Sequence, residues 1–478
     1  MITTTRFGLS VLLLVAVASV TAAQQGSTSK SASVTVASAA STATSSDTTK
    51  ATAAPRSDTA KAEAKKVSLF RPSEINHLRP ADQRGVNMFE APKEDEVPFS
   101  GFALSFGGAF TQEFQGLQHS NAAAPLMVSG VNQNQLIGIG NGFNNAVANL
   151  NVNAQLAPGI RVAMTSYLSS RHHNETWVKD GYLLIDDTPI DNPLLKALFK
   201  YTTLRVGDFE INYGDGHFRR SDNGNSMYNP FVGNYILDAF TTEIGAEVYA
   251  RSSGLIAMLG ATGGEVHGEV TTPQARSGSV LGKLGFDESL ASNVRVRLTG
   301  SFYANNKSAS NTLYSGDRGG SPYYDVLENT QSTESNNAWS GEIHPGFVNK
   351  INAGVINPFI KVGGAEFFGQ FETATGGSFA EASLRTVHQY VYEALYRLGS
   401  SDQFYLGGRY NTVSGQMITQ NQTDQNVNRY QLGGGWFVTP NVLAKLEWVN
   451  QKYNDFPTND IRYGGQFKGF MIQGVVGF

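Results

Sequence analysis

The sequence predicts an all-β fold, a transmembrane antiparallel β-barrel of about 16 strands, with 14–18 as the range. Three observations indicate this class. Apolar and polar side chains alternate along short segments from residue 98 onward, short turns alternate with long polar loops, and the chain ends on an alternating strand with a terminal Phe478. Only 16% of the 478 residues are charged, which is low for a soluble surface. The mean hydropathy of -0.24 suits a wall with one polar face.

The N-terminus has the features of a secretory signal peptide. Arg6 provides the positive charge, Val11–Val17 forms a short apolar run, and small residues follow up to Ala23. Because that run is too short to span a bilayer, an uncleaved anchor is the weaker reading. We predict a signal peptide at 1–23, an Ala/Ser/Thr-rich disordered linker at 24–66 and the barrel at 98–478. Residues 67–97 between them form either a periplasmic strap or a solvated linker.

Period-two alternation assigns side chains to the two faces of the wall. The apolar set, which should face lipid, includes Met164, Phe240, Val248, Leu298 and Leu432. The intervening residues should face the lumen, and the charged ones among them are Arg161, Arg171, Glu243, Glu247, Arg251, Arg295, Arg297 and Arg429. In the last strand the apolar set is Phe470, Ile472, Val476 and Phe478, the terminal signature that directs outer-membrane barrels to their assembly machinery.

The connections alternate in length, as outer-membrane barrels require. Short turns are expected at 157–159, 252–254, 400–402 and 439–441, and long loops near 116–142, 215–238, 306–338 and 416–426. The segment Asp191–Lys200 interrupts this pattern, because its helical spacing and composition predict one short helix where a turn is due.

Residues 427–453, with the terminal strand and 205–240, resemble the phosphate-selective porins O and P and related Bacteroidetes-type outer-membrane barrels. The resemblance implies a 16-stranded porin with an inward-folded third loop and a basic lumen. The loop at 215–238 fits that position because it carries large apolar residues, with a compact external cap as the alternative. Its candidate constriction residues are Arg219, Arg220, Asp222, Tyr228 and Phe231. Phosphate-site residues of the family have no matches here, so phosphate selectivity is not carried over.

These features predict a porin in the outer membrane of a Gram-negative bacterium that passes small hydrophilic solutes. Lumen arginines would favour anions mildly, unless they pair with acids across the lumen and only rigidify it. The alternative is a non-transporting barrel that acts as an adhesin or in a membrane complex. Outer-membrane lipid and the assembly machinery are the expected partners, nucleic acid is not, and self-association is left open.

Catalytic and metal-binding motifs give little support to an enzyme. The sequence lacks the G-x-S-x-G and H-E-x-x-H motifs, and we expect no cofactor and no catalytic site. The run His172-His173-Asn174-Glu175 could bind a metal but is better explained as a polar loop, and His217 and His388 have no predictable catalytic partner.

Overall fold

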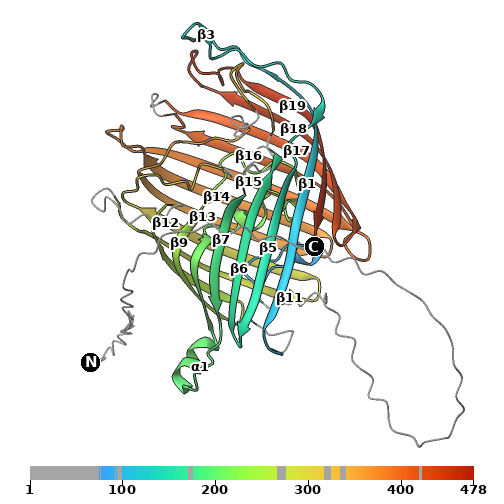
Figure 1. Ribbon diagram of the computed structural model, residues 1–478. Coiled ribbons are helices and arrows are strands. Elements are labelled where there is room, and N and C mark those ends of the chain that lie inside the picture. Colours follow the sequence, from blue (N-terminus) through green and yellow to red (C-terminus); the bar gives the residue numbers. More distant parts are fainter. Residues whose placement is uncertain are drawn as a thin grey trace, which may run out of the picture. The chain divides into compact units, whose positions relative to one another are not determined.

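The chain forms a closed antiparallel barrel. The computed structural model describes residues 75, 77–91, 93, 99–170, 176–265, 276–316, 324–333, 341–418 and 423–478. Strand β1 (Ala103–Ser120) pairs with β5 (Val147–Ala157) on one side and with β19 (Gln466–Gly477) on the other, which closes the sheet. Among the described residues, the 17-stranded sheet comprises 16 wall strands and one short addition, so the predicted fold and strand number are confirmed (Figure 1).

The remaining elements follow in chain order. The other wall strands are β6 (Ile160–Ser169), β7 (Trp177–Ile185), β8 (Thr202–Glu210), β9 (Thr242–Ser252), β10 (Leu255–Thr262), β11 (Ser279–Ala291), β12 (Val294–Asn305), β13 (Lys350–Val362), β14 (Ala365–Gly377), β15 (Arg385–Leu398), β16 (Phe404–Gly415), β17 (Gln425–Thr439) and β18 (Val442–Asn454). Two-residue strands β2 (Met127–Val128), β3 (Val131–Asn132) and β4 (Gly142–Phe143) lie between β1 and β5. Helical turns are η1 (Gln83–Gly85), α1 (Pro193–Phe199) and η3 (Gly216–Phe218).

The two faces of the wall differ as period-two alternation predicts. On β12, Leu298 and Phe302 are 53% and 46% exposed, whereas the intervening Arg297 and Thr299 are each 1% exposed. Successive side chains of a strand point to opposite faces, so one face is apolar and outward while the other points into the barrel. An apolar exterior of this kind is what a barrel in lipid presents.

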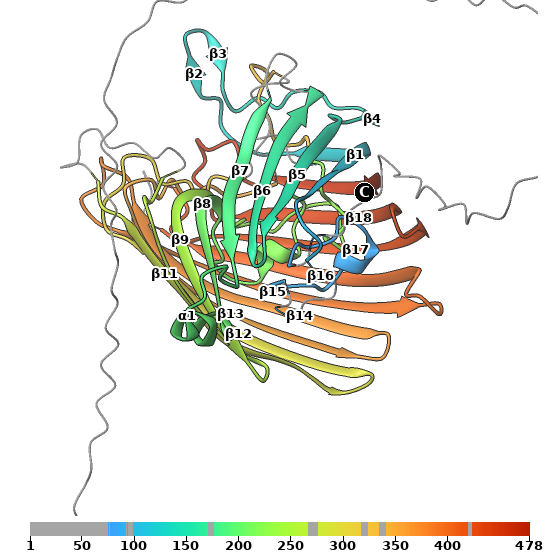
Figure 2. The ribbon, with the colours of Figure 1, turned by 60° about the horizontal axis from the view of Figure 1, so that its bottom comes forward.

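The ends of the barrel have connections of different length. Two-residue turns follow β5, β9, β11, β13 and β17, whereas 121–146, 211–241, 263–278 and 306–349 are long. We call these the short-turn end and the long-loop end; both termini of the barrel lie at the short-turn end (Figures 1 and 2). The predicted alternation is confirmed, but the first loop begins later than expected because β1 continues to Ser120.

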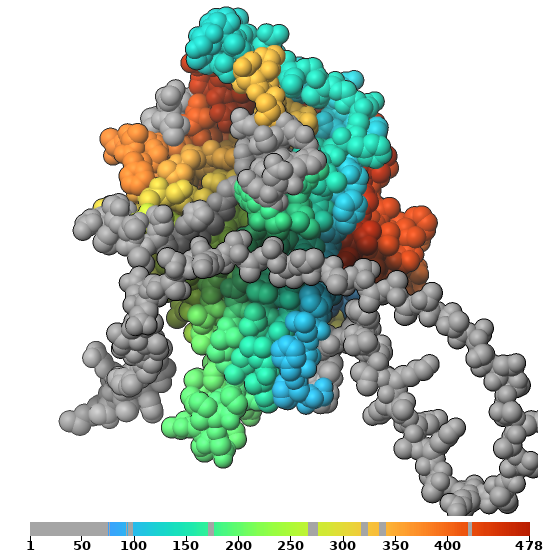
Figure 3. Space-filling view, in the orientation of Figure 1, coloured from blue at the N-terminus to red at the C-terminus, as the bar shows by residue number. Residues whose placement is uncertain are grey.

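The predicted helix is confirmed as α1, which lies between the end of β7 and the start of β8 and projects from the barrel (Figure 3). Asn192 caps it, since its side chain accepts a hydrogen bond from the Leu194 amide at 2.9 Å, and Pro193 occupies the first turn. No helix among the described residues is long and apolar enough to cross a membrane.

The last strand seals the barrel. The Phe478 amide donates to the Gly108 carbonyl at 3.0 Å, and the Gly108 amide donates back to Phe478 at 2.9 Å. Phe470, Ile472 and Phe478 are exposed on the outer face at 38%, 47% and 69%, and Val476 is half-buried beside them. These four side chains therefore share the outward face of the strand that joins β1.

Candidate functional site in the barrel lumen

The connection between β8 and β9, residues 211–241, crosses the inside of the barrel. Almost every residue of this segment is buried, and Figure 2 shows it within the ring of strands. It hydrogen-bonds to inward residues from β1, β5, β12, β13, β15, β16 and β18, namely Thr111, Asn149, Arg297, Asn357, Gln389, Arg409 and Glu447. We call residues 211–241 the lumen segment, because it contacts most of the inner circumference.

Of the predicted constriction residues, Arg219 is bound on three sides. It is 2% exposed, pairs with Glu366 at 2.9 Å and with Glu393, and donates to the Asn87 side chain. A buried guanidinium with two carboxylates is fixed by charge and geometry together. Arg219 therefore connects the lumen segment to β14, β15 and the N-terminal residues.

Arg220 and Asp222 stabilise the lumen segment internally and against β7. Arg220 forms a bidentate pair with Asp238, with Nε–Oδ1 at 3.0 Å and Nη2–Oδ2 at 2.6 Å. Asp222 accepts from Lys179 of β7 at 2.8 Å. Both contacts hold the segment in one path rather than presenting a free charge to the lumen.

Tyr228 and Phe231, the last two candidates, are packed by the N-terminal residues and the wall. The Tyr228 hydroxyl donates to the Pro80 carbonyl, and the Arg79 guanidinium lies 3.5 Å from the centre of its ring. Phe231 is 1% exposed, within a cluster of buried side chains that includes Phe437 of β17. Their rings thus fill space between wall and lumen segment.

The predicted lumen-facing charges lie on the inner face, where most have specific partners. Arg161 pairs with Asp186 at 2.8 Å, Arg295 with Asp287 at 2.7 Å and Arg297 with Asp215 at 2.8 Å. Two of the others donate to backbone carbonyls: Arg251 to Ala91, and Arg429 to Asn234 and Gly341. The Glu243 carboxylate accepts from the hydroxyls of Thr262 and Tyr303, and Glu247 pairs with Arg205. Arg171 lies outside the described residues.

One assignment to the lipid face is wrong. The period-two pattern places Phe240 in the outward set with Val248, but it is 4% exposed and the Arg220 guanidinium lies 4.0 Å from its ring centre. The strand begins only at Thr242, so the period-two pattern does not extend to residue 240. Phe240 belongs to the lumen segment.

An apolar layer fills the inside at the long-loop end. Leu281, Tyr303, Ile351, Val387 and Val427 occupy inward positions near that end of their strands and are at most 1% exposed. They cluster with Val232, Ile236 and Leu237 of the lumen segment and with Leu313, Tyr324, Val326, Ile343 and Phe347 of the 306–349 connection. The described residues of these two long connections therefore bury a hydrophobic core inside the barrel.

A charged layer lies nearer the short-turn end, where it receives residues 77–91. These residues are part of the segment 67–97 that was predicted as a periplasmic strap or a solvated linker, and from here on the strap means residues 77–91. The backbone amide of Gln83 donates a hydrogen bond to the Pro440 carbonyl at 2.9 Å, and the side-chain amide of Asn87 donates one to the Glu366 carboxylate at 2.7 Å. Phe89 is 3% exposed, with its ring against Phe218 and Phe359. The strap thus lies inside the barrel and contacts both wall and lumen segment.

The central ion cluster joins strap, wall and lumen segment. Asp215 accepts from Arg297 at 2.8 Å, from Lys283 at 3.0 Å and from Thr299 at 2.8 Å. Burial disfavours the charged form of Asp215, but the positive charges of Arg297 and Lys283 outweigh it and lower the pKa to about 2. Glu90 of the strap faces the same two cations, and they hold its pKa well below the usual value despite its burial.

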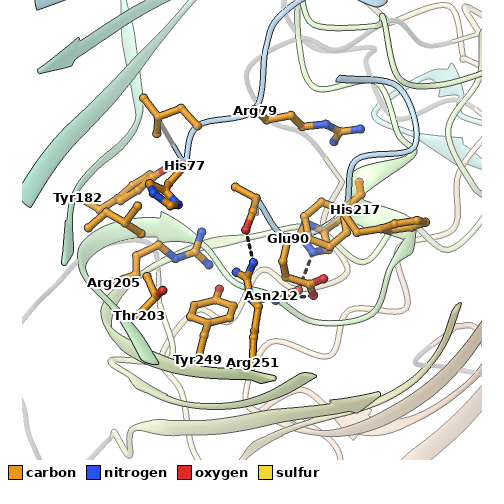
Figure 4. Close-up of a pocket in the computed structure, with 15 residues that line it drawn as sticks. His77, Arg79, Glu90, Tyr182, Thr203, Arg205, Asn212, His217, Tyr249 and Arg251 are labelled. Atoms are coloured by element: carbon orange, nitrogen blue, oxygen red, sulfur yellow. Dashed lines mark hydrogen bonds between the residues drawn. The ribbon is translucent and has the colours of Figure 1, made fainter. Parts of the chain in front are cut away.

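A cavity of about 150 Å³ with a mixed polar and apolar lining remains between the strap and strands β7, β8 and β9. In Figure 4, His77, Tyr182 and Arg205 lie on one side of it, while Glu90 and His217 lie on the other. Its lining includes cationic, anionic and aromatic side chains.

The histidines considered for catalysis have structural partners. His217 is buried, contacts Glu210 at 3.0 Å and Asn212 at 2.9 Å, and burial lowers its pKa. His388 is near Thr373 at 3.0 Å on an exposed face. Residues 172–175 lie outside the described part of the chain, within which no cluster of metal-binding side chains occurs.

Sequence reasoning missed several residues of the charged layer: Lys283, Asp215, Glu366, Glu393, Arg409 and Glu447. All except Asp215 occupy inward positions of strands that alternate, so extending the phase to β11, β14, β15, β16 and β18 would have found them. Asp215 lies in a loop, where no periodicity indicates direction.

No protein-family model and no curated protein matches the chain. Among solved structures, it is similar to in-vitro folded OmpT, an outer membrane protein of Vibrio cholerae, with a TM-score of 0.47 and 10% identity over 80% of this chain and 100% of that one. The anion-selective porin from Comamonas acidovorans gives a TM-score of 0.46 and 12% identity, over 79% and 100% of the two chains. Pseudomonas putida OprB gives 0.47 and 9%, over 79% and 94%.

Proposed function

We propose that the protein is an outer-membrane porin with a restricted lumen, through which small hydrophilic solutes diffuse passively. The observation that carries the proposal is the closed wall of 16 strands around an inward-folded lumen segment. Barrels of 16 to 18 strands are too wide for wall side chains alone to fill, and they leave an aqueous channel. The lumen segment and the strap then determine how much of that width remains.

Charge selectivity follows from the pairing of the lumen arginines. Arg161, Arg295 and Arg297 each lie within 3 Å of a carboxylate oxygen. A compensated pair contributes little net field to the lumen, so we propose at most a mild anion preference. Reversal potentials in a salt gradient across planar bilayers measure this directly, and a clear cation preference would contradict it.

Single-channel conductance of the refolded full-length chain tests the transport function. The matched variant replaces 215–238 by a short Gly/Ser linker, and heat-modifiable gel migration verifies that its wall has closed. We expect small conductance steps for the natural chain and larger ones for the variant. Folded barrels of both chains that produce no steps would refute the transport function.

A second function is favoured by the apolar layer at the long-loop end. Because Leu281, Ile351 and Val387 pack with the inward connections and exclude water, the barrel could instead be a closed membrane support for an adhesive or complex-forming surface. Failure of both chains to conduct would support this alternative.

The finer assignment, to the phosphate-selective porin O and P family and its Bacteroidetes-type relatives, is likewise a proposal. It rests on the 427–453 hairpin, the terminal strand and residues 205–240.

One OmpT structure of Vibrio cholerae is described as a trimer, and we include self-association and outer-membrane localisation in the proposal. Cross-linking in detergent and membrane fractionation test these two points.

A further inference from the structure

The charges around Glu90 balance only when the strap occupies its place in the barrel. Three cations, Lys283, Arg295 and Arg297, meet three carboxylates, those of Glu90, Asp215 and Asp287. Asp215 and Asp287 belong to the barrel, whereas Glu90 is supplied by the strap. The cluster is therefore neutral with Glu90 in place and has one excess positive charge without it.

The groups around Glu90 form a built carboxylate cradle. Its Oε2 lies 2.8 Å from Arg297 Nη1, and its Oε1 lies 3.3 Å from Lys283 Nζ and 3.1 Å from Asn212 Nδ2. The Glu90 side chain is 3% exposed and that of Lys283 is 0% exposed, so water replaces little of this contact. Figure 4 shows Glu90 beside Asn212 at the margin of the cavity.

We propose that Lys283, Arg297 and Asn212 form a binding site for small carboxylate solutes, and that Glu90 of the strap fills it as an intramolecular substitute. One oxygen paired with Arg297 and the other bonded to Lys283 and Asn212 match a carboxylate rather than a spherical halide. Removal of the Glu90 carboxylate leaves Lys283 and Arg297 to share Asp215, with Asp287 as a second partner of Arg297 alone. The excess positive charge favours binding of another anion in place of Glu90.

The proposal deepens the proposed porin function, because it names the class of solute that would bind during passage. The cavity next to Glu90 is also lined by Asn212, Arg205 and Arg251, so a solute in it lies beside one member of the site.

Glu90→Ala gives a direct test by chemical rescue. This substitution removes the same heavy atoms that acetate contains, so acetate fits the space left behind. The full-length variant is refolded in detergent, and the melting temperature of its heat-modifiable form is measured against acetate concentration at constant ionic strength. We expect E90A to melt lower than the natural chain and its melting temperature to rise with the logarithm of acetate concentration.

The controls separate carboxylate binding from general effects of salt. Acetamide has the shape of acetate without its charge, and chloride has the charge without the shape, so neither should raise the melting temperature of E90A. In Glu90→Gln the side chain still fills the site, so acetate should not raise the melting temperature of that variant. If E90A refolds only in the presence of acetate, the folded yield becomes the readout with the same expectation. Equal stabilisation by chloride or acetamide, or no response to acetate, overturns the site.

The transport link has its own readout. In bilayers, acetate should reduce the chloride current of E90A by about twofold or more, and should leave that of the natural chain unchanged. Rescue in detergent without conductance in either chain would refute the proposed porin function and leave the site standing. Conductance without rescue or block would refute the site and leave the porin function standing.

Discussion

Asp215→Asn is the sharpest perturbation of the lumen segment. The Asp215 carboxylate accepts from Arg297, Lys283 and Thr299, and the side chains of Arg297 and Lys283 are both 0% exposed. Removing one member of a buried ion pair leaves an uncompensated charge and costs about 3–5 kcal/mol. Since about 1.4 kcal/mol corresponds to a factor of ten, the released fraction of the lumen segment should rise by roughly two to three and a half orders of magnitude.

Limited proteolysis measures that release. Proteinase K cleavage within 211–241, mapped by mass spectrometry on the folded barrel, should be much faster in D215N than in the natural chain. The matched control is Asp402→Asn, which removes the same charge from an exposed pair with Lys361 at 2.7 Å; Asn also tolerates the φ of 52° at this position. The control pair is worth at most about 1 kcal/mol. Cleavage of D215N at the natural rate, with its wall intact, would refute the reasoning.

Three further predictions follow from single contacts. Deleting Phe478 removes both backbone hydrogen bonds to Gly108 and the exposed terminal ring, so the yield of heat-modifiable barrel should fall; an unchanged yield would contradict this account of barrel closure. Gly233→Ala would bring a Cβ to 2.2 Å from the Tyr324 hydroxyl, so the free energy of unfolding from thermal melts should fall by about 1–3 kcal/mol. In the control Gly300→Ala the Cβ meets open space, and the fall should be less than about 1 kcal/mol. Equal falls for the two variants would contradict this prediction. Because Arg297 and Lys283 hold the pKa of docked Glu90 below 4.5, docking is favoured at higher pH and weakens as the pH falls below that value. A dye on Arg84→Cys should report strap release in that range, and a chain that also carries Glu90→Gln should lose the transition; an unchanged transition in that chain would contradict the assignment.

The wall could be predicted from the sequence because membrane strands impose a strict two-residue period. The inward and outward side chains of β12 follow the predicted phase from Val294 to Phe302, since lipid and lumen lie on opposite faces of one sheet. The same logic failed at Phe240, where the chain had already left the sheet for the lumen. Periodicity assigns faces only where the backbone is extended and paired.

The filling of the lumen could not be predicted in the same way. Asp215 and Glu90 lie in connections without periodic structure, and their partners Lys283 and Arg297 come from neighbouring strands. The aromatic residues of the loop at 215–238 did indicate burial, and composition alone left open whether they would pack inside the lumen or in an external cap. The strap carried still less signal, because its alternation of polar and apolar residues fits a solvated linker equally well.

The buried contacts of the lumen segment and of the strap indicate which of the two is released more easily. Releasing the lumen segment exposes Val232, Ile236 and Leu237, each at most 1% exposed, and burying such a side chain is worth about 1.5–3 kcal/mol. These three residues alone oppose release by roughly 5–9 kcal/mol, before any ion pair is broken. The strap buries one large apolar ring of comparable depth, Phe89, and is otherwise held by polar contacts, of which the ion pairs of Glu90 are buried. Any widening of the bore should therefore begin at the strap, beside the cavity and the carboxylate cradle, while the lumen segment stays in place.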